Sequence, residues 1–277
     1  MSGQSALILA RESLADRALE GLVRANRYAA TTPMQVAAPV VPLRSNPDPK
    51  GEQVDQLLFG EIFEVLEANG GYAWGQARRD RYVGYVDCTS LSEDVGEVTH
   101  WVGVLRAFAY AEPAIRSPAT GPISLNALVM AVEESGRFTL ARGLGWLPSA
   151  HIVPIGRTFV EPAAVVERFL GTPYLWGGRD SIGLDCSGLI QQALYACGRG
   201  CPRDTGLQQG LGAPAPRNAL SRGDLVFWRG HVGMMIDSER LAHANAHHMA
   251  VAIEPLAGAV RRIAQSGGGR PTAYRRI

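Results

Sequence analysis

Asp185-Cys186-Ser187-Gly188-Leu189-Ile190 is the stretch from which the organisation of the chain follows. Apolar residues recur after it at helical spacing, so a helix is predicted to begin at or beside Cys186. Asp185 and Ser187 are residue types that cap helix starts well. A thiol in the first turn of a helix faces unpaired backbone N–H groups and the positive end of the helix dipole. Cys186 is therefore predicted to be an activated nucleophile, with a pKa below the ordinary value of about 8.5.

Two apolar runs downstream are typical of strands. The first, 231–236, opens with His231, and the second, 241–244, contains His243. The residues between them, 237–240, are turn-like. Antiparallel pairing across so short a turn brings the two imidazoles close together.

A nucleophile needs a base, and a third group should orient that base. The sequence predicts that Cys186 is the nucleophile, His231 the base and His243 the group that orients it. His247 and His248 follow closely behind His243. Either of them remains an alternative for the third position.

These motifs together resemble the NlpC/P60 family of cell-wall cysteine peptidases. The resemblance rests on Asp185-Cys186-Ser187-Gly188, on the strand that begins His231-Val232-Gly233 and on the strand with His243-Ala244, in that order, and it spans residues 157–277. It implies an α+β fold with a papain-like catalytic domain that needs no cofactor. No metal site is expected, because the Cys and His residues lack the paired spacing of a zinc finger.

The resemblance also implies which residues surround the nucleophile. Tyr174 falls where the family places an active-site tyrosine, and its hydroxyl is expected to support the oxyanion beside the backbone N–H of Cys186. An Arg-Asp-Ser/Thr element of the family corresponds to residues 203–205. The predicted substrate-binding residues of this domain are Tyr174, Asp185, Ser187, Arg203, Asp204 and Thr205.

The first half of the chain has the composition of small β domains. Short apolar runs separated by Gly, Asn and Asp fill residues 37–95 and again 96–156, and Gly84-Tyr85-Val86 is echoed by Gly145-Trp146-Leu147. Such an internal repeat indicates tandem units. Each unit resembles a bacterial SH3 domain, so two SH3-like β-barrels are expected. Residues 1–36 are predicted to form an N-terminal helical segment.

The resemblance implies a role for the first barrel in specificity. Relatives with this architecture use an acidic and an aromatic residue of that barrel to bind the free amine of L-Ala in the substrate. Glu61 and Tyr85 are the candidates here, and Tyr82 competes with Tyr85. A desolvated ammonium group needs such a carboxylate partner.

Composition and charge indicate the compartment and the partners. The net charge of +1 gives no reason to expect nucleic acid or a membrane as a partner. The four cysteines are scattered without a disulfide framework, and residues 1–30 lack a basic region followed by an apolar core. A cytoplasmic protein is expected, with its protein partners left open.

The expected reaction is hydrolysis of the γ-D-glutamyl–diamino acid bond of murein tri- or tetrapeptides with a free N-terminal L-Ala, in cell-wall peptide recycling. The same fold also performs amide or acyl transfer, so a transferase remains open. The sequence is compatible as well with a secreted hydrolase acting on intact peptidoglycan, whereas the three predicted catalytic residues argue against a non-catalytic binding protein.

Overall fold

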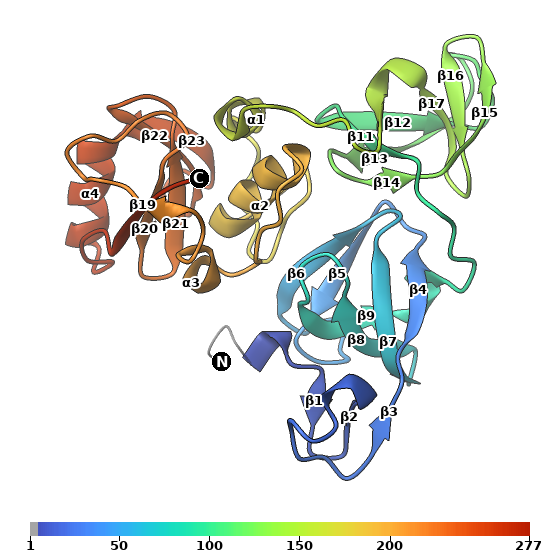
Figure 1. The fold of residues 1–277 in the computed structure, drawn as a ribbon. Coiled ribbons are helices and arrows are strands. Elements are labelled where there is room, and N and C mark those ends of the chain that lie inside the picture. The colour runs from blue at the N-terminus through green and yellow to red at the C-terminus, as the bar shows by residue number, and fades with distance from the viewer. Residues whose placement is uncertain (1–4) are drawn as a thin grey trace. The chain divides into compact units, whose positions relative to one another are not determined.

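The computed structural model describes residues 5–277, and the chain divides into two compact units, 1–155 and 156–277. The first unit is built almost entirely of strands, and the second combines helices with one antiparallel sheet (Figure 1). The peptidase domain predicted to start at residue 157 therefore begins beside this boundary.

The described part of the N-terminal segment is not a helix, so the prediction of a helix there is wrong. It forms a small sheet, β1-β2-β3, together with two 3-10 turns. Their bounds are Ser5–Leu7 (η1), Ala10–Arg11 (β1), Leu14–Asp16 (β2), Arg17–Leu19 (η2) and Tyr28–Ala29 (β3). Gly21 has a φ of +81°, which an α-helix does not accommodate. Leu9 and Leu14 are buried against Leu66 and Trp74, so tertiary packing on the next domain replaces the predicted amphipathic face.

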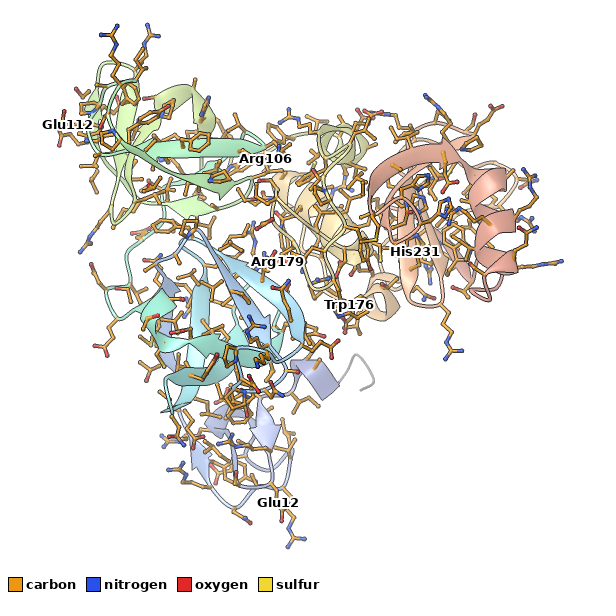
Figure 2. The ribbon with its side chains drawn as sticks, turned by 180° about the vertical axis from the view of Figure 1, so that it is seen from behind. Glu12, Arg106, Glu112, Trp176, Arg179 and His231 are labelled. Atoms are coloured by element: carbon orange, nitrogen blue, oxygen red, sulfur yellow. The ribbon has the colours of Figure 1, made fainter. Side chains whose placement is uncertain are left out.

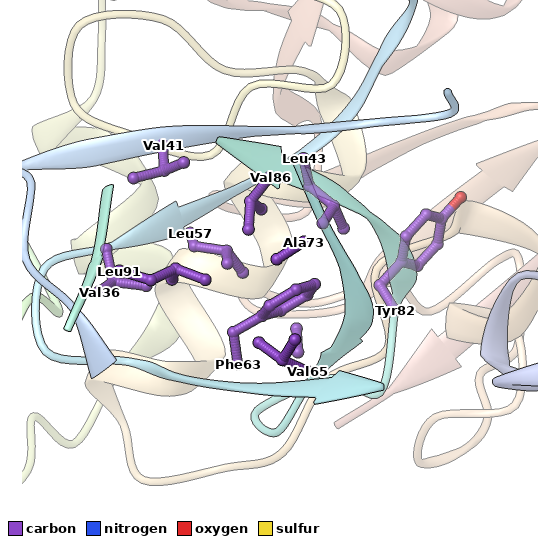
Figure 3. Close-up of a cluster of buried hydrophobic side chains, with 11 residues drawn as sticks. Val36, Val41, Leu43, Leu57, Phe63, Val65, Ala73, Tyr82, Val86 and Leu91 are labelled. Carbon is purple, nitrogen blue, oxygen red and sulfur yellow. The ribbon is translucent and has the colours of Figure 1, made fainter. Parts of the chain in front are cut away.

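A seven-stranded sheet of order β10-β4-β7-β8-β9-β5-β6 forms the first β domain. The strands are Thr32–Val36 (β4), Val40–Arg44 (β5), Gln53–Leu58 (β6), Ile62–Asn69 (β7), Tyr72–Ala77 (β8), Val83–Asp87 (β9) and Leu91–Ser92 (β10), with a 3-10 turn at Cys88–Ser90 (η3). β5 pairs with β6 on one side and with β9 on the other. Figure 3 shows the core of this domain, in which Phe63 lies among aliphatic side chains such as Leu57 and Val86.

Residues 98–155 form a second β domain with a core of its own. Its sheets have the orders β14-β11-β18 and β13-β12-β17-β16-β15. The elements are His100–Val102 (β11), Arg106–Tyr110 (β12), Ala119–Ser124 (β13), Leu128–Val129 (β14), Ala131–Ser135 (β15), Phe138–Ala141 (β16), Gly145–Pro148 (β17), Ser149–His151 (η4) and Ile152–Pro154 (β18). Leu58 and Phe59 of the first domain are buried in this second core.

The two β domains end in the same way. In each, a strand is followed by a 3-10 turn and a short strand: β9-η3-β10 in the first domain and β17-η4-β18 in the second. The similar segments Gly84-Tyr85-Val86 and Gly145-Trp146-Leu147 lie in the first strand of each set, β9 and β17. This order of elements supports an internal repeat, and the assignment of the second domain as SH3-like stays a prediction.

The second unit carries one six-stranded antiparallel sheet of order β19-β24-β20-β21-β22-β23. Its strands are Ala213–Pro214 (β19), Leu225–Trp228 (β20), His231–Met235 (β21), Arg240–Asn245 (β22), Ala250–Pro255 (β23) and Ala273–Arg276 (β24). Its helices are Pro162–Arg168 (α1), Cys186–Ala196 (α2), Thr205–Gln208 (α3) and Leu256–Gln265 (α4). In residues 5–277, none of the helices combines the length and apolar character needed to cross a bilayer.

Helices α2 and α4 position the rest of the second unit. α2 is buried along its whole length and packs on β21 and β22. Apolar residues of α4, including Ala259 and Ile263, pack against Trp228 and Leu241 of the sheet. Strands β21 and β22, which carry His231 and His243, are therefore held in place by the packing of α2 and α4 on the sheet.

Candidate active site

Cys186 is the first residue of α2, and the predicted helix start is confirmed by its cap. Asp185 precedes the helix in an extended conformation, and its Oδ1 accepts a hydrogen bond from the backbone N–H of Gly188 at 2.8 Å. The other oxygen, Oδ2, accepts from the backbone N–H of Gly177 at 3.0 Å. The same carboxylate therefore binds the backbone of the Gly-rich loop and caps the start of the helix.

A buried arginine completes this arrangement. Arg203, which is 2% exposed, donates to both oxygens of Asp185 at 3.0 and 2.6 Å and to the hydroxyl of Ser187 at 2.8 Å. Because the polar atoms of these three residues bind one another away from solvent, they support the start of α2. Their predicted contact with the substrate stays a prediction.

The thiol of Cys186 lies beside the start of β21. Its Sγ is 3.9 Å from the carbonyl oxygen of Gly230, and it also receives hydrogen bonds from the backbone of Val232 and the side chain of Thr205. Gly230 and Val232 are the two neighbours of His231 in the chain. The sulfur of Cys186, the predicted nucleophile, thus lies against the backbone of the two residues that flank His231, the predicted base. The side chain of Thr205 also contacts this sulfur.

The acidity of this thiol differs from the prediction. Burial, and after it the charge of Asp185, raises the pKa of Cys186 to about 11, although Val232, Arg203 and Thr205 act in the opposite direction. The expectation of a lowered pKa is therefore wrong for the free protein. The reason is that the helix start is buried and its capping carboxylate lies close to the sulfur. Cys186 is therefore a protonated thiol at neutral pH in the free protein.

His231 and His243 meet as predicted. Nε2 of His231 lies 2.8 Å from Nδ1 of His243, and the two rings are 5.0 Å apart between centroids. His243 is fully buried, whereas His247 and His248 are exposed in the turn that follows β22. His248 hydrogen-bonds to Asn245. His247 and His248 therefore lie in a solvent-exposed turn, whereas His243 contacts His231, and its role as the third catalytic residue stays a prediction.

The pairing of β21 with β22 explains why these side chains touch. The registered pairs are Met234 with Ala242 and Met235 with Leu241, both near the turn. In the same register His243 falls opposite Gly233, two residues from His231, so the two imidazoles are diagonal neighbours on one face of the sheet.

Both imidazoles are neutral in this environment. Burial, the neighbouring His243 and the Arg262 charge lower the pKa of His231 to about 3. Burial likewise lowers the pKa of His243 to about 4, against a raising contribution from Glu254. A neutral His231 beside a protonated thiol is the starting state for general-base catalysis.

Sequence reasoning missed Glu254 and Arg262. Nε2 of His243 lies 2.8 Å from Oε1 of Glu254, and the Arg262 guanidinium forms an ion pair with the same oxygen. Burial raises the pKa of Glu254, but hydrogen bonds from Arg262 and His243 outweigh that effect and lower it.

A signal for Glu254 was present in the strand pattern. β23 pairs with β22 so that Ala252 lies opposite His243 and Glu254 opposite Leu241. Glu254 is thus a diagonal neighbour of His243 on the same face, and the small Ala252 leaves room for it. Recognising 250–255 as a strand beside 240–245 was the step needed to find it.

Ligand atoms of His243, His248 and Glu254 all lie within 4.8 Å of one another. However, the Glu254 oxygen that bonds His243 also pairs with Arg262, so a fixed cation already neutralises this carboxylate. His243 is further engaged with His231 through its other nitrogen. The cluster is therefore better described as a hydrogen-bonded series than as a metal centre.

Tyr174 lies on the loop before α2 and close to the nucleophile. Burial raises the pKa of its hydroxyl, and the nearby Cys186 and Asp185 raise it further, so the phenol stays protonated and able to donate. Figure 2 labels Trp176 and Arg179 on this loop and His231 on the sheet. Asp204 precedes α3 as its N-cap residue without a capping hydrogen bond from its side chain.

Backbone contact joins this loop to α2. A Cβ atom on Gly188 would overlap the carbonyl oxygen of Gly178 and would lie 3.2 Å from Cβ of Arg179. Only glycine allows this approach. The glycine of the Asp-Cys-Ser-Gly motif is thus required by the packing of the loop on the helix.

Glu61 has a buried carboxylate with partners in its own unit, and its binding of the substrate amine stays a prediction. Glu61 is 1% exposed, accepts from the backbone N–H of Leu58 at 3.1 Å and forms an ion pair with Arg79 at 2.8 Å. Gly60 has a φ of +79° and turns the chain so that the carboxylate folds back on its own domain. The side chain is therefore used within the β unit.

The two tyrosines considered with Glu61 also have contacts inside the first unit. Tyr85 stacks on Trp74 at 6.4 Å between centroids, and its hydroxyl is 3.3 Å from a guanidinium nitrogen of Arg11. Tyr82 is 8% exposed in the core of the first β domain. These contacts lie within the first unit, and substrate binding by Glu61 and Tyr85 stays a prediction.

Comparison with known proteins agrees with this geometry. Residues 171–264 match the NlpC/P60 family, and residues 43–91 match the bacterial dipeptidyl-peptidase SH3 domain. The chain carries an NlpC/P60 peptidase domain. The match to the SH3 family covers the first β domain.

Relatives share this combination to different extents. Dipeptidyl-peptidase 6 of Lysinibacillus sphaericus is 29% identical over 240 residues, which cover 76% of this chain and 86% of the relative. The γ-D-glutamyl-L-lysine dipeptidyl-peptidase of Bacillus subtilis is 30% identical over 133 residues, which are 43% of this chain and 45% of that protein. The chain thus matches less than half of the Bacillus subtilis relative.

The fold agrees with that of a solved structure. The crystal structure of an NlpC/P60 family protein from Bacillus cereus superposes with a TM-score of 0.73 at 19% identity, covering 88% of this chain and 99% of that one. At this identity the match concerns the fold. It extends over both the β domains and the peptidase domain.

Proposed function

We propose that the protein is a cysteine peptidase that hydrolyses the γ-D-glutamyl–diamino acid bond of murein peptides. The observation that carries the proposal is the His231–His243 pair at 2.8 Å, with His231 on a strand whose start lies against the Cys186 thiol, with Sγ 3.9 Å from the carbonyl oxygen of Gly230. A nucleophile, a neutral base and a group that orients the base are the components of covalent acyl transfer.

The reaction proceeds in two halves. His231 takes the proton of the Cys186 thiol while the sulfur attacks the γ-carbonyl carbon of D-Glu. The tetrahedral oxyanion is stabilised by the backbone N–H of Cys186 and the hydroxyl of Tyr174. His231 then protonates the leaving amine of the diamino acid, and a thioester remains. Water, deprotonated by His231, hydrolyses this thioester and releases the acid and the thiol.

The choice of bond and of chain end draws on the relatives. Proteins named γ-D-glutamyl-L-lysine dipeptidyl-peptidase act on a γ-D-glutamyl bond, and the name dipeptidyl-peptidase describes release of a dipeptide. We propose the same for this chain, so that a substrate with a free N-terminal L-Ala yields L-Ala-γ-D-Glu. We propose Glu61, whose carboxylate also pairs with Arg79, as the residue that binds the free amine of this L-Ala.

Mass spectrometry of the products from a panel of murein peptides tests this function. The panel contains L-Ala-γ-D-Glu-L-Lys, its diaminopimelate analogue, an N-acetylated version of each and intact peptidoglycan. We expect L-Ala-γ-D-Glu and the free diamino acid from the first two, and little product from the others. Cleavage at another bond, or transfer to an added amine in place of hydrolysis, would contradict the proposal.

We further propose that the protein acts in peptide recycling in the cytoplasm. In support, all four cysteines, Cys88, Cys186, Cys197 and Cys201, are unpaired thiols, as expected in a reducing compartment. Cell fractionation tests this setting. Recovery of the protein in the periplasm or the medium would overturn it and favour action on the intact wall.

A further inference from the structure

A series of hydrogen bonds runs from an arginine to the proposed base across four elements of the second unit. Arg262 of α4 pairs with Glu254 of β23. Glu254 Oε1 lies 2.8 Å from Nε2 of His243 on β22, and Nδ1 of His243 lies 2.8 Å from Nε2 of His231 on β21. Both nitrogens of His243 are therefore used, and His231 has its Nδ1 left outside the series.

The direction of each hydrogen bond follows from the carboxylate. Arg262 favours the ionised form of Glu254, and an ionised carboxylate only accepts hydrogen bonds. Nε2 of His243 must therefore carry the hydrogen. A neutral imidazole has one N–H, so Nδ1 of His243 carries no hydrogen, and its lone pair accepts a hydrogen bond from Nε2–H of His231. His231 is then left with an unprotonated Nδ1.

We infer that Glu254 determines, through His243, which nitrogen of His231 is free to take a proton, and so makes His231 a base towards Cys186. The inference rests on the proposed roles of Cys186 and His231. Glu254 acts through another residue, so it is a positioning residue. Its carboxylate is a fourth member of the series after the nucleophile, base and orienting histidine.

The proton balance is simple. The proton leaves Sγ of Cys186 for Nδ1 of His231, which becomes an imidazolium with hydrogens on both nitrogens. Its Nε2–H remains donated to His243, and the hydrogen bond from His243 to Glu254 places a negative charge at the end of the series. When the leaving amine takes the Nδ1 proton, His231 returns to its starting form.

The other charged groups near the histidines oppose this imidazolium. Arg262 disfavours the charged forms of both His231 and His243, and His248 disfavours that of His243. Glu254 is the group that favours the charged form of His243. Replacing Glu254 by Gln removes that charge, and its amide N–H₂ is able to donate to Nε2 of His243. Donation in that direction reverses both imidazoles and places the hydrogen on Nδ1 of His231.

The test compares Glu254→Gln with Glu254→Asp in the full chain. Glu167→Gln is the matched control, because Glu167 is also paired with an arginine of the same unit, at 2.7 Å from Arg222. Three quantities are measured: the histidine tautomers by ¹⁵N NMR, the rate of Cys186 alkylation by iodoacetamide at neutral pH, and kcat and KM on L-Ala-γ-D-Glu-L-Lys. Melting temperatures show whether each variant is folded.

In the parent, we expect both histidines to carry hydrogen on Nε2. In Glu254→Gln, we expect hydrogen on Nδ1 of His231, and a fall of about tenfold to a hundredfold in the alkylation rate and in kcat, the range for loss of a hydrogen bond to a charged group. KM should change little. Glu254→Asp should recover most of the rate, and Glu167→Gln should match the parent.

Two results would overturn the inference: hydrogen on Nδ1 of His231 in the parent, or a folded Glu254→Gln variant with unchanged tautomers. The tautomer and alkylation measurements need no substrate. If they come out as expected while no murein peptide is cleaved, the proposed function fails and the role of Glu254 stands.

Discussion

Arg203 donates two hydrogen bonds, of 3.0 and 2.6 Å, to the carboxylate of Asp185, the residue that directly precedes Cys186 at the start of α2. Both side chains are buried, so each charged group needs the opposite charge of the other to offset its loss of hydration. Asp185 in turn caps α2 through Gly188. The position of Cys186 therefore depends on an ion pair that does not itself contain the reacting atoms.

Removing one partner of this pair should be costly. In Arg203→Ala, Asp185 keeps a buried charge without its partner, and we expect a loss of about 3–5 kcal/mol of unfolding free energy. Arg203→Lys keeps the charge but loses the bidentate geometry, so its loss should be smaller. Urea denaturation followed by circular dichroism measures both. Arg199→Lys, at an exposed position, is the control, and an Arg203→Ala variant as stable as this control would contradict the structural role of the pair.

The nucleophile is tested by Cys186→Ala. Without the sulfur no thioester forms, so we expect the rate of murein peptide cleavage to fall by more than about a thousandfold. Cys197→Ala is a control that alters another thiol of the same unit. Residual turnover of Cys186→Ala within about tenfold of the parent would exclude Cys186 as the nucleophile.

The two histidines should differ in how much they contribute. His231 takes part in proton transfer, which is commonly worth about 10²–10⁴-fold in rate, so His231→Ala should lose that much. His243→Ala should retain more activity, because His243 acts by orienting His231. The control is His247→Ala in the exposed turn, which we expect to stay within about twofold of the parent. A large loss in His247→Ala with little change in His243→Ala would reverse the assignment.

The pH dependence of kcat/KM follows from the lowered histidine pKa values. His231 acts as a base only when it is neutral, and its pKa of about 3 keeps it neutral as the pH falls well below 6.5. The acid limb of the profile should therefore lie clearly below pH 6, and activity at pH 5 should be within about twofold of the plateau. Circular dichroism at each pH checks that the protein is folded. An acid limb near pH 6.5 would show that His231 is not held in this environment in the free enzyme.

Substituting the glycine of the helix start should damage the loop contact. In Gly188→Ala the new methyl group would meet the carbonyl oxygen of Gly178, so we expect a loss of about 1–3 kcal/mol in unfolding free energy together with reduced kcat. Gly200→Ala is a suitable control, because nothing lies within 4 Å of a Cβ atom there. Equal stability of the two variants would argue against the close approach of loop and helix.

Local signals in the sequence were enough to predict the helix start at Cys186 and the contact between His231 and His243. The cap at Asp185 and the apolar spacing after it are properties of neighbouring residues, as is the short turn between β21 and β22. The confirmed predictions therefore concern elements that are close in sequence. Glu254 was missed because its role depends on the register between β22 and β23, which no neighbouring residue specifies.

The wrong predictions have physical causes of the same kind. The apolar residues Leu9 and Leu14 suited an amphipathic helix, but they are buried by Leu66 and Trp74 of a different element. The pKa of Cys186 was predicted from the helix start alone, whereas burial and Asp185 outweigh that effect.

Because of the contact between Gly178 and Gly188, the position of Cys186 does not depend on the loop side chains that would contact a substrate. The loop and the start of α2 meet there through main-chain atoms, so their spacing depends little on which side chains the loop carries. Leu175 and Trp176 are exposed on that loop, so substitutions there are expected to leave the position of the Cys186 sulfur unchanged. New preferences for stem peptides can arise in this way without rebuilding the catalytic centre.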